Sequence, residues 1–169
     1  DHARSFDSVA GLYTYRPTGA DLTGAGAPRR LTTLSVTGDY FRLLGIRPAY
    51  GRSFDRSEER PDAGVVVVSF RLASEVCDEA TRCLGRTLTI DGAGARVIGI
   101  MPVRFRDPIS DQADVWTPHV TKTTRGDSYV SVLARLRPGA TVESARAEVA
   151  GLVAADAADH HERQRTTHV

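Results

Sequence analysis

The two cysteines of this sequence, Cys77 and Cys83, are the side chains whose chemistry depends most on their spacing. They are the only cysteines among 169 residues. Six positions apart, they do not match the C-x-x-C of zinc ribbons or thioredoxin-like sites, and a zinc site would need further ligands nearby. The pair is therefore either two free thiols or a disulfide that closes a small loop. Because residues six apart on a continuous helix point in divergent directions, a disulfide requires the helix to end between them.

Other reactive side chains occur in patterns typical of a solvated surface. The adjacent His160 and His161 indicate an exposed polar helix end rather than a metal site. Acidic and basic residues are interleaved between positions 55 and 62, as on a solvated loop. Catalysis needs a nucleophile, a base and an orienting group within reach of one another, and no such set occurs at a recognisable spacing. The sequence therefore predicts no enzyme, no catalytic residue, no cofactor and no bound metal.

Composition restricts the partners and the setting of the chain. With 22 basic and 21 acidic residues the net charge is +1, which argues against nucleic acid as a partner. The hydrophobic fraction of 41% is typical of a folded globular protein. The longest strongly apolar run, Val65–Val68, is far shorter than a bilayer-spanning helix. Because the chain begins with Asp1 and its only methionine is Met101, we expect it to be part of a longer protein.

Residue patterns predict an α+β fold that lacks strict βαβ alternation. Strands are predicted at Ser8–Tyr15, Arg30–Thr37, Val65–Ser69, Thr87–Ile90, Arg96–Met101, Asp114–Pro118 and Tyr129–Leu136. The stretch Arg16–Arg30, rich in Gly, Pro and Ala, is predicted to be a loop. A short helix over residues 40–44 should stop at Gly45, and a second should span residues 70–77.

The last helix, which Thr141 caps, carries apolar residues on one stripe, as in a helix that packs one face against a core. The stripe consists of Val142, Ala145, Val149, Leu152 and Val153. Beyond it, the tail from Asp156 is polar and is expected to fray or to continue as exposed helix.

The motifs, taken in order, resemble the MacB-like periplasmic core domain, the extracytoplasmic domain of FtsX-type ABC permeases. Residues 36–48 match its V-s-x-x-Y-F-x-x-L-G-i-x-P pattern, and residues 51–59 match G-R-x-F-x-x-x-E. Residues 84–102 match a block that ends in V-i-G-V-m-P, and residues 114–118 match D-v-W-x-P. Residues 132–149 match the block that leads into the last helix.

The resemblance implies a two-lobed domain in which the motif residues are structural. The ends of the chain, 1–39 and 119–169, would form a porter-like lobe, and residues 40–118 a smaller inserted α/β lobe. Glycines would serve turns and close packing, and aromatic residues the core. The motif residues are Tyr40, Phe41, Leu44, Gly45, Gly51, Arg52, Gly85, Gly99 and Trp116.

The resemblance also implies a non-catalytic role in a membrane protein. The domain would couple ATPase-driven motion to export, lipoprotein release or activation of a partner. The implied partners are a cytoplasmic ABC ATPase reached through the membrane part, a second permease copy and an extracytoplasmic protein. The alternative is a secreted or anchored binding module that holds a small ligand or peptide between its lobes, which a deep, closed apolar pocket would favour.

Cys77 and Cys83 match no motif of the family. The extracytoplasmic location that the resemblance implies is an oxidising one, and this makes a Cys77–Cys83 disulfide possible while two free thiols remain the alternative.

Overall fold

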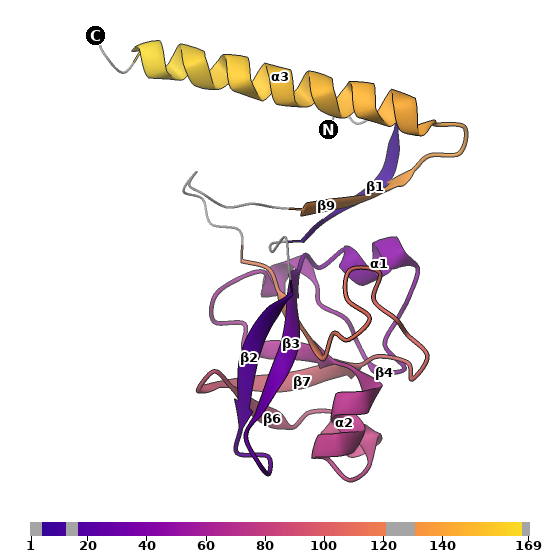
Figure 1. Ribbon diagram of the computed structural model, residues 1–169, viewed down its shortest axis with the longest axis vertical. Coiled ribbons are helices and arrows are strands. Elements are labelled where there is room, and N and C mark those ends of the chain that lie inside the picture. Colours follow the sequence, from indigo (N-terminus) through magenta and orange to yellow (C-terminus); the bar gives the residue numbers. More distant parts are fainter. Residues whose placement is uncertain (1–4, 13–16, 121–130, 167–169) are drawn as a thin grey trace. The chain divides into compact units, whose positions relative to one another are not determined.

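The structure, a computed structural model, describes residues 5–12, 17–120 and 131–166, and for residues 8–12 and 156–166 it describes the backbone alone. The chain forms two compact units (Figure 1). Unit 1 consists of Asp1–Val9 and Ala134–Val169, and unit 2 consists of Ala10–Leu133. The boundaries expected after residues 39 and 118 differ from these units. Residues 10–39 belong to unit 2 because the strands at 18–23 and 29–36 pair with strands further along that unit.

The element order is mixed α/β. The strands are β1 (Phe6–Leu12), β2 (Thr18–Thr23), β3 (Arg29–Val36), β4 (Tyr50–Gly51), β5 (Val65–Val68), β6 (Thr87–Ile90), β7 (Ala93–Ile100), β8 (Val115–Pro118) and β9 (Ser131–Leu136). The helices are α1 (Tyr40–Leu44), α2 (Phe70–Val76) and α3 (Val142–Thr166), with 3₁₀ turns η1 (Arg56–Glu58) and η2 (Ala80–Cys83).

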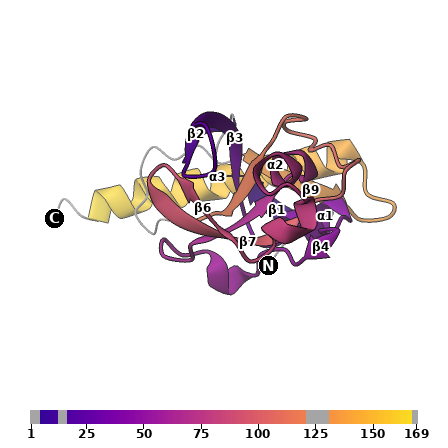
Figure 2. The same cartoon turned by 90° about the horizontal axis from the view of Figure 1, so that it is seen from below.

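The main strands of unit 2 close into a ring. Their order is β2-β6-β7-β5-β8-β3, and β3 pairs with β2 again. The β3–β8 and β5–β7 pairs are parallel, whereas the other pairs of the ring are antiparallel. Figures 1 and 2 show the β2–β3 hairpin from the side and from below. A closed ring leaves few strand edges open, and this favours a rigid unit.

The valine strand β5 is buried on both faces, as its sequence predicts. Val65 and Val67 join a first core cluster with α1, and Val66 and Val68 join a second core cluster with α2. The alternation of a strand thus lets four consecutive valines contribute to two cores.

The predicted strands and helices form with ends that differ by a few residues from those predicted, and the prediction of one loop is wrong. The predicted loop Arg16–Arg30 contains β2, whose residues pair with β3 from Thr18↔Thr33 to Leu22↔Arg29. The connection between the predicted strands Thr87–Ile90 and Arg96–Met101 is shorter than their bounds imply. Asp91 and Gly92, with φ angles of 49° and 78°, form a tight turn between β6 and β7, so that β7 begins at Ala93. The predicted strand residues 13–15, 129 and 130 lie outside the described residues.

Unit 1 contains parts of β1 and β9 and the long helix α3. Of the predicted apolar stripe on α3, Ala145 is buried, whereas the four larger residues are 45–63% exposed. None of the described helices combines the length and apolar content needed to cross a bilayer.

Candidate functional site

A buried carboxylate, Asp107, joins its own loop to β8 and to the distant helix α1. It is 5% exposed, and both of its oxygens accept from the hydroxyl of Tyr40 at 2.9 Å. Its Oδ2 also accepts from Nε1 of Trp116 at 2.8 Å. Its Oδ1 accepts from the backbone N–H groups of Ile109 and Ser110 at 2.9 and 3.3 Å. Since a buried charge is costly unless its hydrogen bonds are made, this set of donors is what makes the site stable.

The main electrostatic effect at this site is on the pKa of the Tyr40 hydroxyl. Burial, followed by the negative charge of Asp107 and the hydrogen bond to it, raises the pKa of the Tyr40 hydroxyl. The phenol therefore stays protonated at neutral pH and acts as a donor. A base or nucleophile would need the opposite shift, so the arrangement suits a structural clamp.

Aromatic rings surround the clamp. Phe41 follows Tyr40 on α1, and its ring lies 5.8 Å from Trp116 and 6.2 Å from Phe54, measured between centroids. The ring of Phe105 lies 6.4 Å from Phe41 and 5.7 Å from Trp116. Such edge-on and tilted contacts stabilise beyond the burial of apolar area. The motif residues Tyr40, Phe41 and Trp116 therefore meet in the first core cluster.

A cavity of about 560 Å³ in unit 2 adjoins this cluster. Its walls include Trp116, Phe105 and Asp107 together with Arg71 and Arg106. These polar groups are engaged with the protein: Arg71 pairs with the buried Asp114 at 2.5 Å, and Arg106 donates to the carbonyl of Phe105 at 2.9 Å. Among the residues that the structure describes, none that lines the cavity is a histidine or a cysteine. The cavity is polar and open to solvent on one side. It therefore differs from the deep, closed apolar pocket that would favour a binding module.

The motif glycines allow close approach between backbones. A Cβ atom on Gly99 would lie 2.3 Å from the carbonyl oxygen of Arg52, and one on Gly51 would lie 2.2 Å from that of Ile98. Gly45 ends α1 with φ 70°, and its N–H donates to the carbonyl of Arg42 at 3.0 Å. Gly85 has a φ of 82°, and no atom lies within 4 Å of the position that a Cβ would take. Its backbone conformation, and not a lack of space, is therefore what favours glycine there.

The remaining motif residues differ in exposure. Leu44 is partly buried against the first core cluster. Arg52 is exposed and binds both carboxylate oxygens of Glu58 at 2.8 Å, which fixes the turn that follows β4. Before α1, Asp39 accepts from Arg42 and Arg56 at 2.9 and 2.7 Å. Arg56 and Glu58, paired with Asp39 and Arg52, thus lie on an exposed, charged loop, as the interleaving predicts, and such exposed pairs contribute little to stability.

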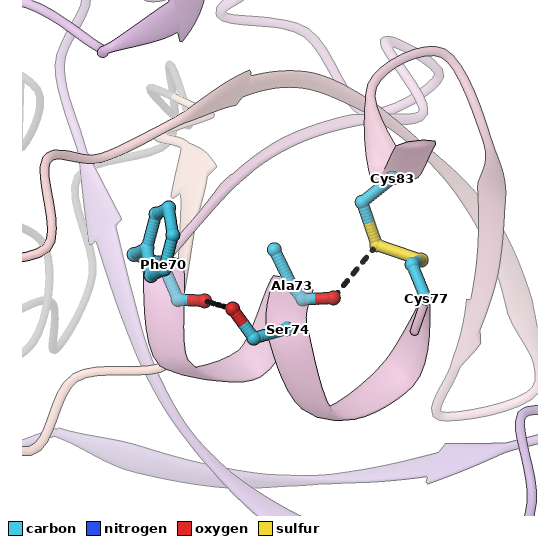
Figure 3. The surroundings of a disulfide bond; sticks show 5 residues. All are labelled: Phe70, Ala73, Ser74, Cys77 and Cys83. Carbon is cyan, nitrogen blue, oxygen red and sulfur yellow. Dashed lines mark hydrogen bonds between the residues drawn. A yellow bond between two sulfur atoms is a disulfide. The ribbon is translucent and has the colours of Figure 1, made fainter. Parts of the chain in front are cut away.

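The cysteines lie in the second core cluster of unit 2, and their sulfur atoms are bonded (Figure 3). Cys77 is the C-cap of α2, so the helix ends before Cys83, as a disulfide between the two residues requires. The sulfur of Cys83 lies 3.6 Å from the carbonyl oxygen of Ala73. Because a disulfide sulfur carries no hydrogen, this is a packing contact rather than a hydrogen bond.

No pattern in the sequence points to Asp107, the residue that joins the motifs. It precedes a proline in an apparent loop, and such an aspartate is typical of an exposed turn. Asp111, which lies in the same loop, is exposed and lines the cavity. Among the described residues, no three His, Cys, Asp or Glu side chains gather to hold a metal ion. The side chains of His160 and His161 lie outside the described part.

Comparison with known proteins identifies the class. The pattern of the MacB-like periplasmic core domain matches residues 2–152. The macrolide export ATP-binding/permease protein MacB of Shigella dysenteriae serotype 1 (strain Sd197) is 28% identical over 117 residues. The match covers 67% of this chain and 18% of that protein, so the chain spans less than a fifth of that relative.

Solved structures share the fold. The periplasmic region of MacB from Actinobacillus actinomycetemcomitans superposes with a TM-score of 0.68 at 17% identity, over 90% of this chain and 68% of that one. The extracellular domain of the ABC-type transporter YknZ from Gram-positive bacteria gives 0.61 at 14% identity, over 86% and 72%. The fold and the motif order thus define the extracytoplasmic domain of an ABC permease. The chain belongs to the MacB-like periplasmic core domain family, which confirms the family and the location predicted from the sequence.

Proposed function

We propose that this domain is a non-catalytic coupling element: it transmits ATPase-driven motion of a membrane permease to export, lipoprotein release or activation of a partner outside the membrane. The observation that carries the proposal is the family match over residues 2–152. The named relative is an ATP-binding/permease protein. By analogy, a cytoplasmic ABC ATPase is the source of motion, and a second permease copy and an extracytoplasmic protein are the further partners.

The packing of unit 2 suits a part that transmits displacement. Its ring of strands contributes to two core clusters, and the Asp107 clamp joins α1, β8 and the loop between β7 and β8. A rigid body moves as a whole, and hinge or shear motion then falls at its connections. The two units would act as the two lobes, with the porter-like lobe built from both ends of the chain.

The test uses an external binder on the whole permease with its ATPase in lipid vesicles. A single-domain antibody is selected against the 169-residue chain, with Val103, which is 62% exposed, in its epitope. If the domain is coupled to the ATPase, the binder changes the rate of ATP hydrolysis on the other side of the membrane. By linkage, trapping the ATP-bound state also changes the affinity of the binder.

Val103→Asp is the matched control, because it removes an epitope contact from an exposed position and leaves the cores unchanged. Vesicles with this variant should hydrolyse ATP at the same rate with or without the binder. Several binders to different epitopes that saturate the domain and leave both the hydrolysis rate and their own nucleotide dependence unchanged would contradict the coupling role. That outcome would favour an independent binding module.

A further inference from the structure

The disulfide of unit 2 is shielded from any reagent in solution. Cys77 is 2% exposed and Cys83 is 0% exposed. Both lie in the second core cluster with Leu72 and Ala73 of α2 and with Val97 of β7. Thiol–disulfide exchange requires a third sulfur to reach one of the two sulfurs directly. In the folded domain, neither sulfur offers such an approach.

The pairing of the cysteines is local in the chain. Cys77 ends α2, and Asp78, with a φ of 56°, reverses the chain direction. The 3₁₀ turn Ala80–Cys83 then returns Cys83 to the helix end, with the two Cα atoms 5.4 Å apart. Short-range turns therefore bring the sulfurs together, and no distant strand is needed for them to meet.

Their burial, in contrast, depends on distant strands. The N–H of Gly85 donates to the carbonyl of Val97 at 2.8 Å, and the N–H of Val97 donates to the carbonyl of Arg86 at 2.8 Å. These bonds dock the segment after Cys83 onto β7, which itself pairs with β5 and β6. The sulfurs become inaccessible only when this docking is complete.

We propose that Cys77 and Cys83 are joined in the mature protein by a disulfide donor that acts before this segment docks onto β7, so that the domain is a substrate for oxidative maturation. The donor is a protein with an oxidised dithiol or a small-molecule disulfide such as glutathione disulfide. One cysteine thiolate attacks the donor disulfide, forms a mixed disulfide and releases one donor thiolate. The second cysteine thiolate attacks the cysteine sulfur of that mixed disulfide, which closes the Cys77–Cys83 bond and releases the second donor thiolate. Two electrons pass from the chain to the donor, and the two thiol protons are released or taken up by the donor thiolates.

The inference rests on the extracytoplasmic location and on burial, and it does not require coupling to an ATPase. Its test uses only the 169-residue chain, so its failure would leave the proposed function untouched, and the reverse also holds.

The experiment compares the rate of oxidation in two states of the reduced chain. One sample is held unfolded in denaturant, and the other is first refolded under reductant, with folding followed by circular dichroism. Glutathione disulfide is then added after removal of the reductant, and remaining thiols are blocked and counted by mass spectrometry. We expect the refolded chain to be oxidised about 100-fold more slowly, because it reacts only through local opening.

The variant Val103→Cys, with the native disulfide intact, provides the accessible control. Its single exposed thiol should react with glutathione disulfide at similar rates in the folded and unfolded chain. If the reduced wild-type chain does not fold in native buffer, oxidation must precede folding, and this also supports the proposal. Oxidation of a folded, reduced chain as fast as the Val103→Cys thiol would overturn it. Free thiols in protein isolated from its own extracytoplasmic compartment without reductant would do the same.

Discussion

The hydroxyl of Tyr40 donates to both carboxylate oxygens of Asp107 at 2.9 Å, across 67 positions of sequence. Since the same carboxylate accepts from the indole N–H of Trp116, it links two family motifs through a residue that belongs to neither. A charge that is buried and fully hydrogen-bonded fixes geometry more strictly than an apolar contact does, because each lost bond leaves a polar group unsatisfied. The clamp therefore makes α1, β8 and the intervening loop one body.

Asp107→Asn should destabilise the domain by about 3 kcal/mol. The amide offers one oxygen in place of two, and its N–H₂ group faces donors from Tyr40, Trp116 or the backbone. Urea unfolding of the 169-residue chain measures the loss. The matched variant Asp111→Asn alters an exposed carboxylate of the same loop and should stay within about 0.5 kcal/mol of wild type. Equal stability of the two variants would show that the buried hydrogen bonds do not hold the fold together.

Gly99→Ala should be strongly destabilising, by about 3 kcal/mol or more, because the new Cβ meets the backbone carbonyl of Arg52 rather than a flexible side chain. Gly151→Ala is the control, because the same substitution there should raise the stability. Gly151 lies within α3 and has nothing within 4 Å of an added Cβ, so alanine should stabilise the helix by roughly 0.5–1 kcal/mol. Thermal unfolding of both variants checks the pair, and a neutral Gly99→Ala would refute the close-approach role.

Stability should fall between pH 7 and pH 5, and His119 should contribute to the fall. Burial lowers the pKa of the His119 imidazole, against a smaller opposing effect of Glu59. The folded state therefore favours the neutral ring. The resulting stability is present above the unfolded pKa of about 6.5 and is lost as the pH falls through the lower folded pKa. His119→Gln, which cannot titrate, should show a smaller fall in free energy of unfolding over this range. An identical pH profile for the two proteins would exclude His119 as a source.

Local sequence signals predicted the elements that short-range chemistry determines. Gly45 stops α1 in a left-handed conformation, and the Asp91–Gly92 pair makes a tight hairpin turn. The four valines of β5 are buried on both faces, as a strand without a polar face must be. The family followed from the order and spacing of such motifs.

Features that depend on long-range contacts could not be predicted in this way. β2 is a sequence of Thr, Gly, Ala, Asp and Leu with weak strand propensity, and it forms because β3 and β6 pair with it from either side. Asp107 is buried where Tyr40, 67 positions away, and Trp116 of β8 donate to it. On α3, spacing showed which residues share a face, but it does not show whether anything covers that face.

Distances between spin labels in the whole permease with its ATPase test most directly whether nucleotide binding moves the two units of this domain. One label pair joins the units, on Ala147→Cys of unit 1 and Val103→Cys of unit 2. The control pair, on Ala27→Cys and Val103→Cys, lies within unit 2. All three positions are exposed, and the native cysteines are buried and bonded.

Pulsed electron paramagnetic resonance then compares the nucleotide-free permease with a hydrolysis-deficient, ATP-bound one. The coupling account predicts that the distance between the units shifts beyond the width of the control distribution, while the distance within unit 2 stays unchanged. Unchanged distributions for both pairs, with ATP bound to the partner ATPase, would contradict it.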